Sequence, residues 1–141
     1  MYSDLTQATT ILNNGHFTCV LRRGEEVITD TRRGIRPLME LLDSGRDLRR
    51  FSAADKVVGK AAAMIYCLLQ ISALHAGVLS RPALQILQRH GIRVTWDTLV
   101  DAIRNRTGTG FCPMESAVME LDDPSMAPDA IRRALAALDS K

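Results

Sequence analysis

The stretch Ser52–Gln70, SAADKVVGKAAAMIYCLLQ, constrains the fold most, because it predicts a long helix that is apolar on nearly every side. We expect the Ser52 hydroxyl to cap this helix, with Asp55 at the acidic position of a capping box. The unbroken apolar run Ala61–Leu69 is far shorter than the roughly 20 residues that span a bilayer. The stretch therefore predicts a buried central helix around which the other elements pack.

Two of the three lysines fall in this predicted helix, at Lys56 and Lys60, whereas arginine occurs fifteen times in the chain. Residues four apart share one face of a helix, so these two lysines form a stripe that continues over apolar side chains. One interpretation is that both amino groups reach solvent near the helix start. The other is that Lys60 supplies positive charge to a ligand site, with Asp55 and Lys56 beside it.

Hydrophobic periodicity and glycine or proline punctuation predict the remaining elements. In chain order these are a helix over Ser3–Asn13, a hairpin of Phe17–Leu21 and Glu26–Asp30, a helix over Gly34–Leu42, the central helix, a strand over Ile71–Leu79, a helix from Arg81 that Gly91 ends, and a strand over Ile92–Val100. Gly77 inside a strand indicates a bulge or a close backbone approach. Strands separated by helices imply parallel neighbours, so we expect an α/β fold of three layers, α/β/α, with a mixed central sheet.

The length and composition of the chain limit the number of domains and the kinds of partner that we expect. A chain of 141 residues is one domain, 1–141, in which we expect residues 1–15 to form an outer helix and 122–141 a helical extension. A net charge of +2 and 4% aromatic residues give no basic stripe or stacking surface, so no nucleic-acid partner is expected. Three cysteines without a CxxC pair predict neither a disulfide framework nor a zinc ribbon. Without a secretory leader or a membrane span, we expect a cytoplasmic protein that can form a homo-oligomer.

The stretch NRTGTGFCPME, residues 105–115, contains the densest group of candidate functional residues in the sequence. Pro113 is a typical first helical residue, which makes Cys112 the cap, and the N–H groups at a helix start favour a thiolate. One interpretation is a glycine turn and a helix cap, with Glu115 bonding back to the cap N–H. The other is a loop that binds an anion or small ligand, although TGTG matches neither a Walker A loop nor a dinucleotide fingerprint. Its ligand contacts would come from Asn105, Arg106, Gly108, Gly110, Cys112 and Glu115.

Three pieces of the chain carry a resemblance: ADKVVGKAAAMIYCLL, VLSRPALQILQRHGI and IRNRTGTGFCPMESAV. Over about residues 17–120 the chain resembles an uncharacterised bacterial and archaeal family, domain of unknown function 1893. The resemblance implies a cytidine-deaminase-like fold with the long helix packed on the central sheet. Catalytic deaminases need His or Cys with Glu at the start of that helix and PCxxC at the start of the following one. Here those places hold Gly59-Lys60-Ala61 and Ser80-Arg81-Pro82-Ala83-Leu84, so we expect no metal and no other cofactor.

Taken together, these features predict a deaminase-fold protein without zinc that binds a small polar or anionic ligand, nucleotide-like in one version. In an enzymatic version with group transfer, Cys112 is the nucleophile, Lys60 favours its thiolate, and Glu115 or Asp55 handles protons. The alternative is a non-catalytic structural or protein-interaction domain, in which the loop is only a helix cap and apolar helices mediate self-association.

Overall fold

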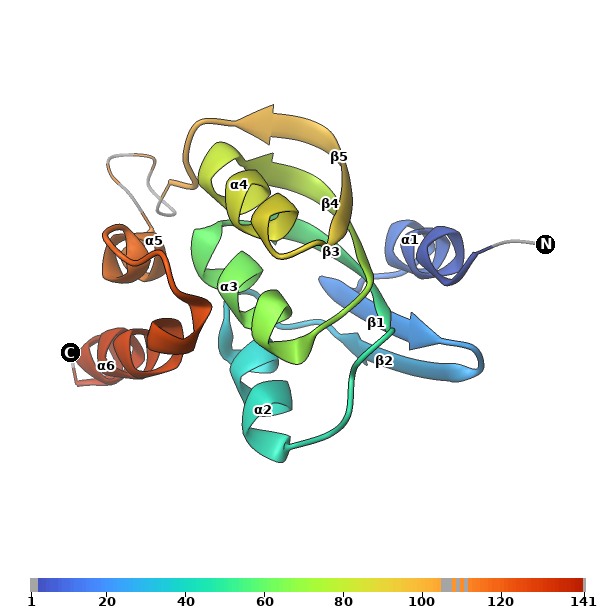
Figure 1. Ribbon diagram of the computed structural model, residues 1–141, viewed down its shortest axis with the longest axis horizontal. Helices are drawn as coiled ribbons and strands as arrows, with labels where there is room; N and C mark the ends of the chain where they lie inside the picture. Colours follow the sequence, from blue (N-terminus) through green and yellow to red (C-terminus); the bar gives the residue numbers. More distant parts are fainter. Residues whose placement is uncertain (1–2, 105–107, 109, 111, 141) are drawn as a thin grey trace.

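The computed structural model describes residues 3–104, 108, 110 and 112–140, and Figure 1 shows its elements around one sheet. In chain order they are α1 (Asp4–Asn14), β1 (Cys19–Arg23), β2 (Glu26–Asp30), α2 (Arg36–Ser44), β3 (Ser52–Val58), α3 (Lys60–Leu69), β4 (Ala73–Ser80), α4 (Arg81–Arg89), β5 (Arg93–Val100), α5 (Pro113–Val118), the 3₁₀ helix η1 (Pro124–Met126) and α6 (Ala127–Asp139). Among the described residues, no helix combines the length and the apolar character needed to cross a membrane.

The described residues form a sheet of five strands in the order β2-β1-β3-β4-β5. β1 runs antiparallel to both of its neighbours, whereas β3, β4 and β5 run parallel through the crossover helices α3 and α4. The class is therefore α/β with a mixed sheet, as the sequence predicts. Parallel strands joined by helices leave their carboxyl ends at one edge of the sheet, which is where α/β proteins place their ligands.

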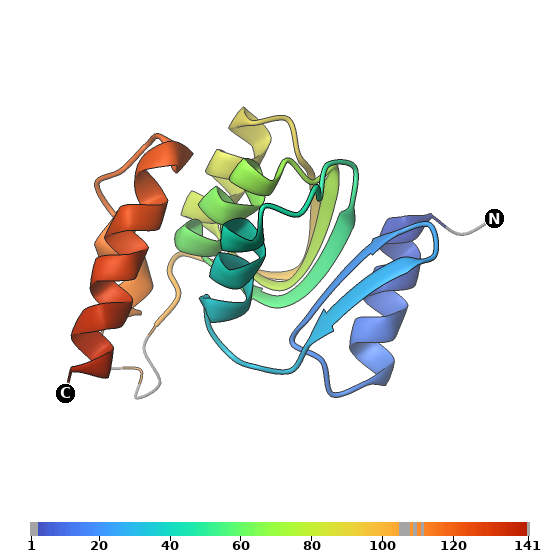
Figure 2. The ribbon, with the colours of Figure 1, turned by 90° about the horizontal axis from the view of Figure 1, so that it is seen from below.

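Helices cover the sheet unequally (Figure 2). Of the helices in the described residues, α1 alone lies on one face, against β1 and β3, while α2, α3 and α4 lie on the other. α5 and α6 form an outer layer that contacts α3. The main core lies between the sheet and α3, whose Met64, Ile65 and Tyr66 have no exposed surface. A smaller cluster of Ala8, Leu12, Val20 and Ala54 holds α1 on the opposite face.

The prediction of one helix over Ser52–Gln70 is wrong in its first third, which is strand β3. This strand lies in the middle of the sheet, with α1 against one face and α3 against the other, so several of its side chains are buried. Such a strand reads as a continuous apolar run, and periodicity does not separate it from a buried helix. Ser52 is a buried strand residue rather than a cap, and α3 begins only after Gly59.

The new boundary also separates the two lysines. Lys56 lies on β3 and Lys60 is the first residue of α3, so they do not form one helical stripe. Asp55 is likewise a strand residue and takes no part in a capping box of α3. Its side chain lies on the face of β3 that α3 covers, because it accepts a hydrogen bond from Tyr66 of that helix.

Gly77 on β4 confirms the expected close backbone approach. A Cβ atom at this position would lie 2.7 Å from the carbonyl oxygen of Lys56 on β3, which is backbone and cannot move aside. We therefore expect Gly77→Ala to lower the free energy of unfolding by about 2 kcal/mol or more, as overpacking does elsewhere. Urea denaturation measures the effect, with Thr98→Ala on the exposed strand β5 as control. Equal stability of the two variants would contradict the close approach.

Candidate functional site

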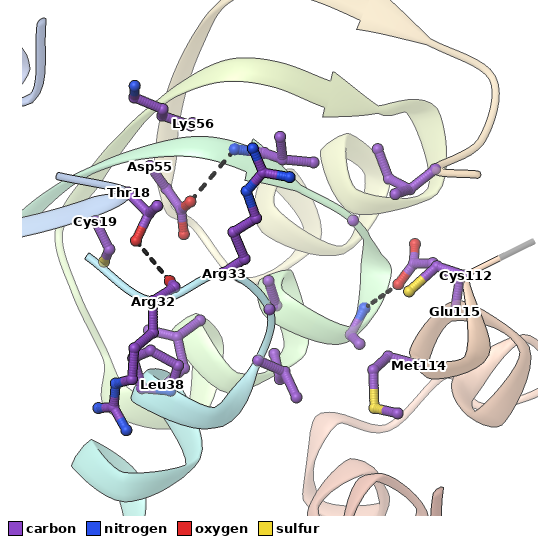
Figure 3. A pocket seen from close by; sticks show the side chains of 18 residues that line it. Thr18, Cys19, Arg32, Arg33, Leu38, Asp55, Lys56, Cys112, Met114 and Glu115 are labelled. Atoms are coloured by element: carbon purple, nitrogen blue, oxygen red, sulfur yellow. Dashed lines mark hydrogen bonds between the residues drawn. The ribbon is translucent and has the colours of Figure 1, made fainter. Parts of the chain in front are cut away.

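A cavity of about 490 Å³ opens at the carboxyl end of β3, beside the first turn of α3 (Figure 3). Its volume lies within the range of about 300–1,000 Å³ that small-molecule sites occupy. The polar residues that line it are Thr18, Cys19, Arg32, Arg33, Asp55, Lys56, Cys112 and Glu115. Its apolar wall comprises Ile35, Pro37, Leu38, Val57, Ala61, Ala62, Ile103 and Met114.

Asp55 belongs to a chain of polar side chains in which Cys19 and Tyr66 are buried and Asp55 itself is half-buried. The hydroxyl of Tyr66 donates to Asp55 Oδ2 at 2.7 Å, and the backbone N–H of Val57 donates to Oδ1 at 3.3 Å. The sulfur of Cys19 lies 3.2 Å from the Tyr66 oxygen. Because the only phenolic hydrogen goes to Asp55, the Cys19 thiol is the donor in this contact. The order of donation is therefore Cys19 to Tyr66 to Asp55.

Burial sets the protonation of this chain. It raises the pKa of Asp55 to about 6, although the hydrogen bonds from Tyr66 and from backbone N–H groups act in the opposite direction. Burial also raises the pKa values of the Tyr66 phenol and the Cys19 thiol well above their ordinary values. Near neutral pH the thiol and the phenol are thus neutral donors, while Asp55 carries the negative charge.

Glu115, in the first turn of α5, caps the start of a different helix, α3. Its Oε1 accepts the N–H of Lys60 at 2.6 Å and its Oε2 accepts the N–H of Ala61 at 2.9 Å. Gly59 precedes these residues, and a Cβ atom there would collide with the Glu115 carboxylate. The carboxylate thus satisfies two N–H groups of the first turn and neutralises the positive end of the helix dipole.

The Lys60 side chain forms a hydrogen bond outside the cavity. Its Nζ donates to the carbonyl oxygen of Met119 at 3.1 Å, at the end of α5, and Lys60 is not among the described residues that line the cavity. Lys56 does line the cavity, but its amino group points away from it (Figure 3). Arg33 instead extends from the loop after β2 toward the end of β3.

Of the residues singled out in the sequence, the structure brings Asp55, Lys56, Cys112 and Glu115 to one cavity. Cys112 is the residue that precedes α5, as predicted, with Pro113 in the first turn. One of the two interpretations had Glu115 bonding back to the cap N–H, but its carboxylate instead accepts from the first turn of α3. Gly108 and Gly110 are not among the described residues of the cavity wall, and Asn105 and Arg106 lie outside the described residues.

Sequence reasoning missed Thr18, Cys19, Arg33 and Tyr66. A signal for Tyr66 exists, since it is the one hydroxyl in the otherwise apolar run that α3 buries, and a buried tyrosine hydroxyl needs a partner. Cys19 offers no such signal, because its sequence neighbours say nothing about α3. Within residues 3–104, 108, 110 and 112–140, no group of three or more His, Cys, Asp or Glu side chains is placed to hold a metal ion.

Residues 7–135 match the model of a family described as TM1506, a domain of unknown function (DUF1893). The chain belongs to this family. It is similar to a DUF1893 family protein (TM1506) from Thermotoga maritima whose crystal structure is known, with 28% sequence identity and a TM-score of 0.84. The likeness covers 97% of this chain and 92% of the Thermotoga protein. No curated protein matches the chain. Membership of DUF1893 thus establishes a family and a shared fold without naming an activity.

Proposed function

We propose that this DUF1893 protein binds a small polar molecule in the cavity at the carboxyl end of β3, with Asp55 as the residue that recognises it. The observation that carries the proposal is a half-buried carboxylate in the cavity wall, held in place by Tyr66. Enclosing a carboxylate in protein costs free energy, and carboxylates perturbed in this way cluster at functional sites.

The surroundings of Asp55 favour a particular ligand chemistry. An ionised carboxylate accepts hydrogen bonds, so the ligand presents an N–H or O–H donor to Asp55. The walls formed by Ile35, Leu38 and Met114 suit an apolar or planar body. Arg33 is exposed and lines the same cavity, where it suits an anionic group. A nucleotide-like molecule combines a planar base bearing donors with an anionic group.

The position of Glu115 changes where an anion can bind. Its carboxylate already fills the N-terminus of α3, so the anionic part of the ligand is assigned to Arg33 rather than to that helix end. Lys60 is likewise engaged with Met119, which weakens the group-transfer version in which Lys60 activates Cys112. Cys112 and Asp55 both line the cavity.

We also infer a deaminase-like arrangement without zinc. The cavity lies at the first turn of α3, which is the place where the family resemblance puts a deaminase's zinc ligand and catalytic glutamate. Gly59, Lys60 and Ala61 occupy that turn, and none of them is a zinc ligand. This supports binding rather than zinc hydrolysis.

Thermal-shift screening tests the proposal, because a ligand that binds the native state raises its stability by mass action. Nucleosides, nucleotides, sugar phosphates and amino acids are screened at pH 7.5, and titration calorimetry measures the affinity of each hit. Asp55→Asn is expected to weaken binding by about 10- to 100-fold, the effect of a lost charge-assisted hydrogen bond. Asp101→Asn, a change of the same chemistry at an exposed residue, is the matched control.

The pH dependence provides a second readout. Because the pKa of Asp55 is about 6, a ligand that donates to its carboxylate loses affinity as the pH falls through about 6. A hit that binds Asp55→Asn as tightly as the natural protein would contradict the assignment of Asp55. If none of these compounds raises the melting temperature, the non-catalytic interaction domain becomes the better reading.

A further inference from the structure

Among the described residues, strand β5 forms one end of the sheet (Figure 1). It is eight residues long, RVTWDTLV, and contains no proline. A strand in this position presents a row of backbone N–H and C=O groups that can pair with another strand. Five of its residues are exposed, and Trp96 keeps 38% of its surface accessible.

One hydrogen bond shows which backbone groups point outward. The N–H of Arg93 donates to the carbonyl oxygen of Ser72 at 3.3 Å, toward β4. Successive residues of a strand direct their backbone groups to opposite sides. The backbone N–H and C=O groups that bond to β4 are therefore those of Arg93, Thr95 and Asp97. The backbone groups that point to the open edge are those of Val94, Trp96 and Thr98.

A second copy of β5 can lie antiparallel to the first, related to it by a two-fold axis. Hydrogen bonds then form only where residues whose backbone groups point to the open edge lie opposite each other. If the axis passes at Thr95, Val94 and Trp96 of one copy exchange backbone hydrogen bonds with Trp96 and Val94 of the other. The same register sets each Arg93 opposite an Asp97 of the second copy. An axis at Trp96 pairs no opposite charges, and an axis at Asp97 sets two carboxylates against each other.

The side chains on this face suit the register centred on Thr95. His75 on β4 contacts Asp97 at 3.3 Å and Thr95 at 2.8 Å, and these contacts hold both side chains on the face that Arg93 shares. The Asp97 side chain is still 67% exposed, so its carboxylate can also accept from an arginine. On the other face, Trp96 meets Val94 of the second copy, which is an apolar pair of the kind that stabilises adjacent strands.

We propose that two copies of this chain associate through β5, in the register centred on Thr95, so that their sheets join into one continuous sheet. Charged residues on an edge strand usually discourage pairing. Here they favour one partner and one register, because each positive residue meets a negative one. The inference concerns the sheet edge and is independent of the cavity.

Sedimentation velocity of the full chain over a range of concentrations tests this proposal. The natural protein is expected to dimerise, and Asp97→Arg or Arg93→Asp to raise the dimer dissociation constant by about tenfold or more, because each change puts like charges in contact twice. The double variant Arg93→Asp/Asp97→Arg restores opposite charges and is expected to restore dimerisation to within about threefold. Glu25→Arg, at the turn between β1 and β2, is the matched charge-reversal control and is expected to behave as the natural protein.

A backbone variant covers the case in which a charge reversal unfolds the chain. Trp96→Pro removes an N–H that the ladder with β4 does not use, so it is expected to yield a folded monomer, with circular dichroism as the check on folding. A natural protein that stays monomeric at every concentration overturns the proposal. So does a dimer that survives Asp97→Arg, or single reversals whose combination restores nothing.

Discussion

Asp55→Asn is expected to stabilise the fold at pH 8, by about 2 kcal/mol, because asparagine removes a half-buried charge and keeps one side-chain oxygen that accepts from the Tyr66 hydroxyl. The pKa of Asp55 is about 6 in the folded protein and has a reference value of 3.8. The folded state therefore holds this proton more tightly than the unfolded state. Ionisation of Asp55 lowers stability as the pH rises from about 4 to about 6, and the full cost remains above that window.

Guanidinium denaturation at several pH values measures this difference. The gap between Asp55→Asn and the natural protein is expected to be largest above pH 7 and to close below about pH 4, where Asp55 is protonated in both states. Asp101→Asn, on an exposed carboxylate, is expected to show no such gap. A stability difference that does not change with pH would show that the charge of Asp55 is not the cause. A residue whose replacement stabilises the fold while weakening binding is typical of a functional site.

Glu115→Ala is expected to lower the free energy of unfolding by about 2–3 kcal/mol, because it removes two charge-assisted hydrogen bonds from the start of α3. Those bonds, at 2.6 and 2.9 Å, are partly buried, so the N–H groups of Lys60 and Ala61 lose acceptors that water replaces incompletely. The same contacts join α5 to α3, and their loss also loosens the outer layer of helices.

Urea denaturation and amide hydrogen exchange together measure this effect. Exchange at Lys60 and Ala61 is expected to accelerate in Glu115→Ala, while amides at the end of α3 stay protected. Glu120→Ala, at an exposed glutamate just beyond α5, is the matched control. If both variants lose the same small amount of stability, Glu115 is not the cap of α3. Glu115→Gln is expected to fall between them, because its amide offers one oxygen in place of two.

Local patterns predicted much of the fold. The hairpin of β1 and β2 is present as predicted, although β1 covers Cys19–Arg23 rather than Phe17–Leu21. The capped start of α4 at Ser80 and the proline-led start of α5 lie where capping rules place them. These features depend on residues a few positions apart in the chain. Strand β3 was missed because its character depends on β1 and β4, which pair with it on either side.

In the candidate site, too, some features follow from local sequence and others depend on how the elements pack together. The sequence alone determined that Cys112 precedes a helix, that Glu115 lies in its first turn, and that Asp55 and Tyr66 fall in the most apolar region of the chain. Only the tertiary structure decided that Tyr66 bonds Asp55, that Glu115 caps α3 and that Lys60 turns to Met119. The physical reason is that a polar group's partner is chosen by which elements pack together. Capping and periodicity act over a few residues, whereas Asp55 takes its partner and its raised pKa from burial beneath α3.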